Sequence, residues 1–220
     1  MNCLEGLLSI EGIDGSGKST FLKEFTNNFK AKNVSMQRYD VSPFTEEGIK
    51  YIRSLLSNKD KTPNDVKNKS LLYAFISDFI LHEYNISEFR KNTPNSIVIS
   101  DRYILSTIAY QSLTVNFYNV IDIVQKSGIK LPKYIIYLDC SPKIACQRII
   151  QRTKTDGKEV EMFEKESILE KIYSNYQKAL DWVKMNSDTI IIECDTGTKP
   201  IDEYKTHYIP LIQDVVEKGI

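Results

Sequence analysis

The sequence has no apolar run of the about 20 residues that a membrane-spanning helix requires. Its N-terminal stretch, MNCLEGLLSIEG, carries an acid at Glu5 and no basic segment, and its apolar run is too short for a signal peptide. Net charge is also absent, because 29 acidic residues balance 29 basic ones. Broad binding to DNA or RNA needs a basic face. The composition therefore predicts a cytoplasmic protein that binds neither a membrane nor a nucleic acid.

Cysteine and histidine are scarce. The four cysteines lie far apart or six residues apart, with no CxxC pair and no Cys/His cluster. This spacing argues against a disulfide framework and a zinc site, and favours reduced thiols. No repeat, low-complexity tract or Pro/Gly-rich linker divides the chain, so residues 1–220 are expected to form one domain.

Arginine is also rare, at six of the 29 basic residues. A guanidinium binds planar anions through two parallel hydrogen bonds, which lysine cannot do, so each arginine is a candidate anion ligand. The alternative for any one of them is chance within a lysine-rich composition. The six are Arg38, Arg53, Arg90, Arg102, Arg148 and Arg152.

Short apolar segments alternate with helical patterns along the chain. Strands are predicted at 7–13, 34–39, 97–100, 134–139 and 189–194. Helices are predicted at 18–32, 46–57, 65–90, 104–127 and 143–152, then a long one ending near 185 and a last one from about 200. This order predicts an α/β fold, a five-stranded parallel sheet with helices on both faces. The polar stretch 153–161 is expected to form a short lid.

The segment 12–19 reads GIDGSGKS, which matches the phosphate-loop pattern GxxxxGK[ST] and places the fold among the P-loop NTPases. Its backbone N–H groups and the start of the next helix favour phosphate oxygens. Lys18 can reach the β- and γ-phosphates, and Ser19 can bind Mg²⁺. The alternative is a glycine-rich structural turn. The expected ATP-binding residues are Gly12, Ile13, Asp14, Gly15, Ser16, Gly17, Lys18, Ser19 and Thr20.

A phosphate loop alone does not specify the reaction. A GTPase would add an NKxD motif, and Asn58, Lys59 and Asp60 lack its spacer. An ABC-type ATPase needs a longer chain and an LSGGQ-like signature, which this sequence does not contain. A small phosphotransferase remains.

Three segments together resemble the thymidylate kinase family. They are IEGIDGSGKST at 10–20, VISDRYILSTIAYQ at 98–111 and YIIYLDCSPKIACQRIIQR at 134–152, of which the second is the most specific. The resemblance covers most of the chain in the correct order. It implies a nucleoside monophosphate kinase that uses ATP and Mg²⁺ to convert dTMP to dTDP, and it implies a homodimer.

The second segment supplies the expected acceptor site. Asp101 follows a predicted strand, where its carboxylate can hold a Mg²⁺-bound water, and Arg102 can clamp the acceptor's phosphate. A plain surface ion pair between these two residues is the alternative. The resemblance further implies that Asp14 accepts a hydrogen bond from the 3′-hydroxyl, that Tyr110 packs against the sugar and that Thr107 faces the base. Tyr110 could equally be a core aromatic residue.

The helix LLYAFISDFILH at 71–82 departs from the family pattern LLFxADRxQH. Phe75 takes the position that stacks on thymine, Asp78 matches the family's Asp, and Phe79 replaces an arginine that hydrogen-bonds O4 of the base. Both phenylalanines could instead be ordinary core residues. Because a phenyl ring donates no hydrogen bond, a kinase for another pyrimidine monophosphate is an alternative function.

Two further candidates for the acceptor phosphate precede this helix. Arg38 could match the first arginine of the family's REPGG segment, although the sequence continues as YDVSP. Arg53 matches an arginine of the bacterial iRxLL pattern and could reach the acceptor phosphate instead.

The phosphate loop carries no arginine, so the resemblance implies that the arginine finger comes from the lid. This points to Arg152, with Arg148 one turn earlier on the same helix face and close to ATP. A solvated basic helix end is the alternative. Glu164 is a weaker candidate, because Met162 replaces the arginine of the family's DRxE segment. A different class of function is a nucleotide-binding sensor that transfers no phosphoryl group. The sequence argues against a sensor, because it contains Lys18, Asp101 and Arg102 together.

Overall fold

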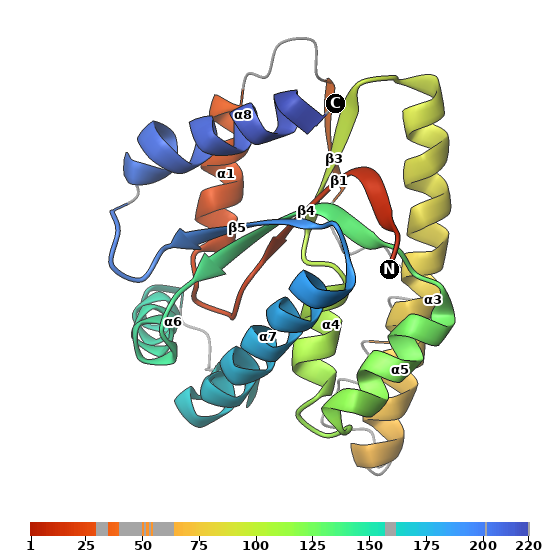
Figure 1. Cartoon of the computed structure of the whole chain (residues 1–220). Coiled ribbons are helices and arrows are strands. Elements are labelled where there is room, and N and C mark those ends of the chain that lie inside the picture. The colour runs from red at the N-terminus through yellow and green to blue at the C-terminus, as the bar shows by residue number, and fades with distance from the viewer. Residues whose placement is uncertain are drawn as a thin grey trace.

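A parallel sheet forms the centre of the computed structural model, which describes residues 1–29, 35–39, 50, 52, 54, 64–156, 162–200 and 202–219. The strand order is β2-β3-β1-β4-β5, and every neighbouring pair is parallel (Figure 1). The strands are β1 (Cys3–Glu11), β2 (Ser35–Tyr39), β3 (Ser96–Asp101), β4 (Leu131–Asp139) and β5 (Ile190–Asp195). The predicted α/β architecture is confirmed.

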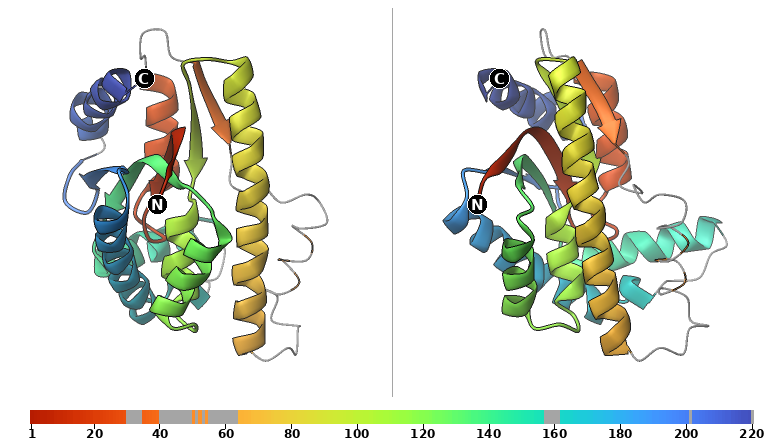
Figure 2. Two further views of the ribbon diagram at one scale, coloured as in Figure 1. Left: turned by 45° about the vertical axis from the view of Figure 1, so that its right-hand side comes forward. Right: turned by 90° about the vertical axis from the view of Figure 1, so that its right-hand side faces the viewer.

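Helices cover both faces of this sheet. One face is packed by α1 (Lys18–Asn28), the π-helical turn η2 (Tyr204–Tyr208) and α8 (Ile209–Gly219). The other is packed by α3 (Asn64–Asn92), α4 (Ile104–Gln111), α5 (Phe117–Ser127) and α7 (Glu166–Asn186). Helix α6 (Pro142–Asp156) and the short turn η1 (Met162–Glu164) lie between β4 and α7 in the chain. Figure 2 shows α3 as a long helix along one side of the molecule.

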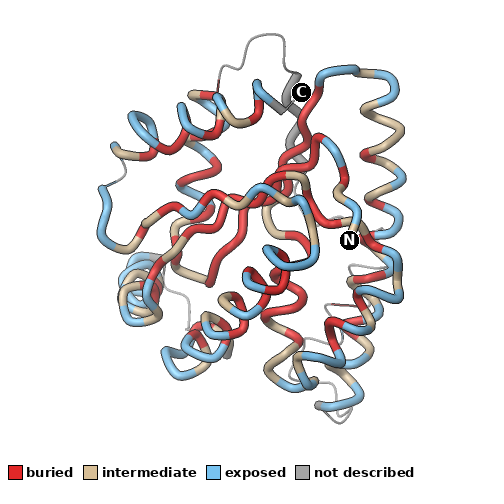
Figure 3. The backbone as a smooth tube through the Cα atoms, viewed as in Figure 1, coloured by how far each residue is buried: buried red, intermediate tan, exposed pale blue. Residues whose placement is uncertain are grey.

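The strands read as nearly continuous apolar runs because both faces of the sheet are covered. Successive side chains of a strand point to opposite faces, so Leu7 packs under α3 and α4 while Leu8 packs under α1 and α8. Val98 joins the first of these cores, and its neighbours Ile97 and Ile99 join the second. Figure 3 shows the buried segments running along the strands.

Some predicted boundaries differ from the observed ones. The predicted helix 104–127 is two helices, because the side chain of Asn116 caps α5 by accepting the Tyr118 N–H at 3.0 Å. Helix α6 extends through residues 153–156, which the sequence analysis assigns to the lid. The hydroxyls of Thr153 and Thr155 donate to backbone carbonyl oxygens about one turn earlier in this helix. Residues 157–161, the other part of the predicted lid, lie outside the described residues, as does most of the predicted helix 46–57.

Four strands end in an acidic residue at the same edge of the sheet. Asp139 accepts the Tyr173 hydroxyl at 3.0 Å, and Asp195 caps the turn that follows β5 by accepting backbone N–H groups. The other two, Glu11 and Asp101, lie beside the glycine-rich loop. None of the described helices combines the length and apolar character needed to span a bilayer.

Candidate active site

The loop between β1 and α1 has the curled backbone that the motif predicts. Gly12 and Gly15 adopt φ values of +145° and +80°, which L side chains rarely occupy. A Cβ at Gly15 would lie 2.4 Å from the Ala145 carbonyl oxygen on α6, and one at Gly12 would lie 2.8 Å from the Leu138 carbonyl oxygen. Glycine is therefore required at both positions by conformation and by space.

Lys18 lies in the first turn of α1 and is only 8% exposed. Its ammonium donates to the carbonyl oxygens of Gly12 at 3.0 Å and Ile13 at 2.8 Å, and it lies 3.8 Å from Asp14 Oδ1. Burial and the nearby Arg102 lower the pKa of Lys18 to about 7, against the opposing effect of Asp14. A phosphate bound in the loop would favour the charged form of this side chain.

Arg102 follows β3 in a left-handed backbone conformation with φ +74°. Its N–H donates to the Ile10 carbonyl oxygen at 3.0 Å, and its own carbonyl oxygen accepts the Ser100 hydroxyl at 2.7 Å. Left-handed backbone at a non-glycine residue costs about 1–3 kcal/mol and is concentrated at functional sites. This turn directs the guanidinium toward the glycine-rich loop.

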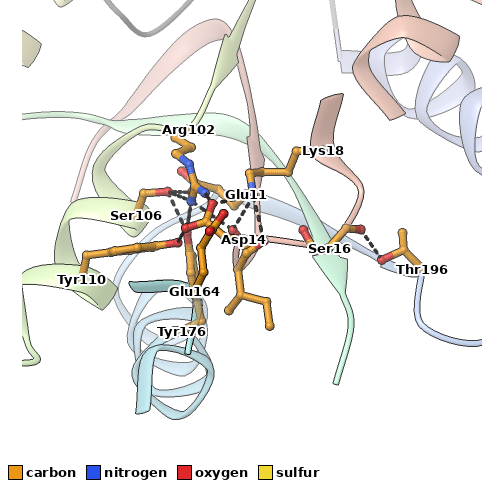
Figure 4. Close-up of polar contacts among 12 residues, drawn as sticks. Glu11, Asp14, Ser16, Lys18, Arg102, Ser106, Tyr110, Glu164, Tyr176 and Thr196 are labelled. Carbon is orange, nitrogen blue, oxygen red and sulfur yellow. Dashed lines mark hydrogen bonds and ion pairs between the residues drawn. The ribbon is translucent and has the colours of Figure 1, made fainter. Parts of the chain in front are cut away.

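The guanidinium of Arg102 joins the loop to the helices behind it (Figure 4). Nη2 forms an ion pair with Asp14, and Nη1 donates to the Gly12 carbonyl oxygen at 3.0 Å. Nη1 also contacts the hydroxyls of Ser106 at 3.2 Å and Tyr176 at 3.3 Å. The predicted acceptor clamp and the predicted phosphate loop are therefore in direct contact.

Asp14 connects this cluster to Tyr110. Asp14 Oδ2 accepts the Tyr110 hydroxyl at 2.8 Å, and the Arg102 guanidinium carbon lies 5.2 Å from the centre of the Tyr110 ring. Burial opposes ionisation of Asp14, but Arg102 and Lys18 outweigh it and lower the pKa of this carboxyl. An ionised carboxylate beside an aromatic ring suits a sugar hydroxyl, so the structure brings together the two residues predicted to contact the sugar.

The two predicted magnesium ligands lie on either side of the loop. Asp101 Oδ1, at the end of β3, is buried and has no hydrogen-bond partner among the described residues. Such an oxygen needs a cation or a water to satisfy it. Ser19 is exposed in the first turn of α1. No group of three or more His, Cys, Asp or Glu among the described residues could hold a metal ion by itself. A hydroxyl and a carboxylate supply the oxygen ligands that Mg²⁺ prefers, and this ion usually takes its other ligands from phosphates and waters.

Glu11 is a site residue that sequence reasoning missed. Its side chain is fully buried, and burial raises the pKa of its carboxyl to about 7. Its oxygens accept the Tyr103 N–H at 2.8 Å, the Ser106 hydroxyl at 2.6 Å and the Tyr176 hydroxyl at 3.3 Å. The available signal was an acid within the predicted apolar strand 7–13, directly before the first loop glycine.

Arg148 and Arg152 have separate partners, although they lie one turn apart on α6. Arg148 Nη2 donates to the Thr196 carbonyl oxygen at 2.7 Å, and the Thr196 hydroxyl donates to the Ser16 carbonyl oxygen at 2.8 Å. Thr196, which the sequence did not indicate, thus links Arg148 to the glycine-rich loop. The Arg152 side chain is 57% exposed and pairs with Glu164 at 2.5 Å.

The assignment of Phe79 to substrate binding is not supported by its position in the structure. Phe79 is 2% exposed, and its ring centre lies 4.5 Å from that of Tyr103 in the core, so it has no surface for a base. Asp78 pairs with His82 on its own helix at 3.4 Å. Phe75 is half-buried against the core, and Thr107 is buried on α4. The base contacts of Phe75, Asp78 and Thr107 stay predictions.

Phe79→Ala is expected to lower the free energy of unfolding by about 3–5 kcal/mol, because it removes a fully buried ring. The preference among acceptor bases should stay unchanged in the folded protein. Urea denaturation and acceptor competition measure the two effects. Tyr118→Ala is the control, since Tyr118 is 78% exposed on α5. A changed base preference without loss of stability would return Phe79 to the acceptor site.

Two predicted acceptor ligands cannot be placed. Arg38 lies on β2, but its side chain is outside the described residues, and all of Arg53 is outside them. Their roles stay predictions.

Comparison with known proteins gives a consistent result. Residues 10–196 match the family model described as thymidylate kinase. A protein named thymidylate kinase from Leptospira borgpetersenii serovar Hardjo-bovis (strain L550) is 34% identical over 199 residues, 84% of this chain and 88% of that protein. A probable thymidylate kinase from Methanococcus aeolicus is 28% identical over 207 residues, covering 93% and 94% of the two chains. A thymidylate kinase from Geobacillus sp. (strain WCH70) is 28% identical over 217 residues, covering 95% and 96%.

Proposed function

The chain belongs to the thymidylate kinase family, and from this premise we propose that it transfers the γ-phosphoryl group of ATP to dTMP, giving dTDP and ADP. One observation supports this function most strongly. The Arg102 guanidinium binds Asp14 and the Gly12 carbonyl oxygen, so the groups proposed for donor and acceptor occupy one site. A phosphate-binding protein without an acceptor would not need this junction.

The donor's phosphates bind to the backbone N–H groups of residues 12–19, and Arg148 and Thr20 contribute to the ATP site. Lys18 neutralises charge on the β- and γ-phosphates. Arg102 binds the acceptor's phosphate through its guanidinium, and Asp14 accepts the 3′-hydroxyl of the sugar. An acceptor phosphate oxygen then attacks the γ-phosphorus in line, and ADP leaves. In such transfers the protein acts mainly by positioning the reactants and by neutralising charge.

Ser19 and Asp101 are proposed to hold Mg²⁺, Asp101 through a water. The orphaned Asp101 Oδ1 supports this assignment. When bound, the ion would neutralise phosphate charge during transfer.

Arg152 is proposed as the arginine finger. Its side chain is more than half exposed, and its guanidinium pairs with the carboxylate of Glu164. The exposed end of Arg152 can turn toward the transferring phosphoryl group, and the bound phosphates would offset the cost of leaving Glu164, whose side chain is only 10% exposed. Glu164 would then serve to hold Arg152 in place between turnovers.

We also propose a homodimer formed through α3. The outward face of this helix carries apolar side chains that are 46–63% exposed. Three of them recur every seven residues, which places them along one stripe, as in paired helices. The stripe consists of Val66, Tyr73, Ile80, Leu81 and Tyr84.

The double change Ile80→Glu and Tyr84→Glu is expected to convert a dimer to a monomer, because it places charges on this stripe. Light scattering coupled to size-exclusion chromatography measures the mass. Tyr118→Glu, on an exposed aromatic residue of α5, should leave the dimer intact. A wild-type monomer, or a double variant that stays dimeric, would rule out this interface.

The function is tested by measuring ADP release from MgATP with dTMP, dUMP, UMP, CMP, dCMP, AMP and GMP as acceptors. We expect dTMP to be preferred. Preference for another pyrimidine monophosphate is the second candidate, and the observation that favours it is Phe79 where the family has an arginine. ATP binding with no ADP release from any acceptor would instead support a nucleotide sensor.

A further inference from the structure

We propose that Glu11 is a positioning residue for the acceptor site, and that its two carboxylate oxygens hold the backbone and the side chain of Arg102. The proposal rests on the function proposed above, because it takes the acceptor's phosphate as the ligand of Arg102. Glu11 itself would touch neither nucleotide. It lies behind the guanidinium, fully buried at the end of β1.

The first oxygen acts on the backbone. Glu11 Oε1 accepts the N–H of Tyr103 at 2.8 Å, directly after the left-handed turn at Arg102. Tyr103 is buried, so without this acceptor its N–H would lack a partner. The Arg102 N–H is in turn held by Ile10, the residue before Glu11. The end of β1 therefore fixes the strained turn from both sides.

The second oxygen acts on the guanidinium through two hydroxyls (Figure 4). Glu11 Oε2 lies 2.6 Å from the Ser106 hydroxyl, which lies 2.6 Å from the Tyr176 hydroxyl. The Tyr176 hydroxyl lies 3.3 Å from Arg102 Nη1. These four groups come from β1, α4, α7 and the turn after β3.

The donors and acceptors in this series of hydrogen bonds are fixed by the chemistry of the groups at its two ends, Arg102 and Glu11. A guanidinium has only donors, so Tyr176 must accept from Arg102. The Tyr176 hydroxyl then donates onward, to the Ser106 hydroxyl at 2.6 Å or to Glu11 Oε2 at 3.3 Å, and the Ser106 hydroxyl donates to Glu11. Every proton has an acceptor only if Glu11 Oε2 is itself an acceptor, which a carboxylate is.

The indirect connection from Glu11 reaches the guanidinium through Nη1 alone. A direct, two-bond ion pair between Glu11 and Arg102 would occupy the donors that a phosphate needs. Here burial raises the pKa of the Glu11 carboxyl, and the nearby Arg102 and Lys18 cations act against burial and favour its ionised form. Nη2 faces Asp14 at the loop. Glu11 thus orients Arg102 without competing for its ligand.

Glu11→Gln tests the role of the second oxygen. Glutamine keeps a carbonyl oxygen that accepts the Tyr103 N–H. Its NH₂ group, however, donates to Ser106, so the Ser106 hydroxyl must donate to Tyr176 instead of accepting from it. We expect the KM for dTMP to rise about tenfold or more, while kcat and the KM for ATP change less than about threefold. Tyr176→Phe breaks the same chain, so it should raise the KM for dTMP as well. Because both changes break the same series of hydrogen bonds, the KM for dTMP of the double variant should rise by less than the product of the two single increases.

Tyr137→Phe is the matched control. Tyr137 is as deeply buried as Tyr176 and packs against it, but its hydroxyl accepts from Gln177 instead of contacting Arg102. Its KM for dTMP should equal that of the wild type. If Glu11→Gln does not fold, the Tyr176→Phe and Tyr137→Phe comparison carries the test alone.

Three results would overturn the proposal. The first is an unchanged KM for dTMP in folded Glu11→Gln or Tyr176→Phe protein, and the second is that the effects of the two changes multiply independently. Equal losses in the KM for ATP and for dTMP would also overturn it, since they indicate general damage to the fold. A wild-type protein that does not phosphorylate dTMP is a different failure, because it rejects the proposed function before any variant is compared.

Discussion

Arg102→Ala is expected to lower kcat/KM for dTMP by about a thousandfold, with the Kd for ATP changed less than about twofold. The guanidinium is the group that joins the acceptor site to the glycine-rich loop, through Asp14 and the Gly12 carbonyl oxygen. Alanine removes the positive charge and leaves Asp14 facing the acceptor's phosphate. The backbone N–H groups and Lys18, which are proposed to bind the donor, are retained. Steady-state kinetics with dTMP varied, together with calorimetric titration of ATP, separate the two effects.

Arg102→Lys distinguishes charge from geometry. Lysine keeps the charge but cannot form two parallel hydrogen bonds to a phosphate or reach Ser106 and Tyr176 together. We expect an intermediate loss, closer to that of alanine than to the wild type. If Arg102→Ala retained wild-type kcat/KM for dTMP, the assignment of the acceptor site would be wrong.

Lys18→Ala is expected to reduce kcat by about a thousandfold and to weaken ATP binding as well. The ammonium is buried at the glycine-rich loop, where little water screens it from the phosphates. Its loss therefore affects the bound donor and, more strongly, the charge that develops during transfer. Single-turnover measurements of dTDP formation and ATP titration give the two quantities.

Lys23→Ala is the matched control for this experiment. Lys23 lies on the same helix α1 but is exposed, away from the loop. It should behave as the wild type in both measurements. Lys18→Ala protein with normal kcat would show that the loop binds nucleotide without contributing to transfer.

The sequence predicts the parts of this molecule that depend on short-range patterns. The motif at 12–19 requires glycine for a local reason, which the structure shows as positive φ values at Gly12 and Gly15. The close approach of Leu138 and Ala145 adds a second reason that comes from distant parts of the chain. The strands were recognisable because a sheet covered on both faces needs apolar residues at consecutive positions. Asp101 and Arg102 were recognisable because they directly follow such a strand.

The missed residues depend on contacts between distant parts of the chain. Glu11 and Tyr176 meet across 165 positions, and no local pattern indicates that two buried polar groups will share a hydrogen bond. Tyr176 lies on the long helix that the sequence predicts to end near 185, where nothing in the local sequence distinguishes it from an ordinary core residue. Its ring is indeed buried, but its hydroxyl reaches the guanidinium.

Helix α3 shows a second limit of sequence reasoning. Phe79 and Ile80 are neighbours, yet the first is buried in the core and the second is 49% exposed. Apolar residues occur on both sides of this helix, so their spacing does not reveal which side faces the sheet. The resemblance to the family's helix pattern places Phe79 at a base-contacting position. In the structure, its ring packs inward against Tyr103.

The most direct test of the central claim follows the phosphoryl group itself. The protein is incubated with ATP labelled at the γ-phosphate, Mg²⁺ and dTMP, and the products are separated by anion exchange. The account predicts that the label moves from ATP to dTDP in the wild type, and that Arg102→Ala forms far less dTDP while still binding ATP. Label that stays in ATP, or that appears only as inorganic phosphate, would contradict the account.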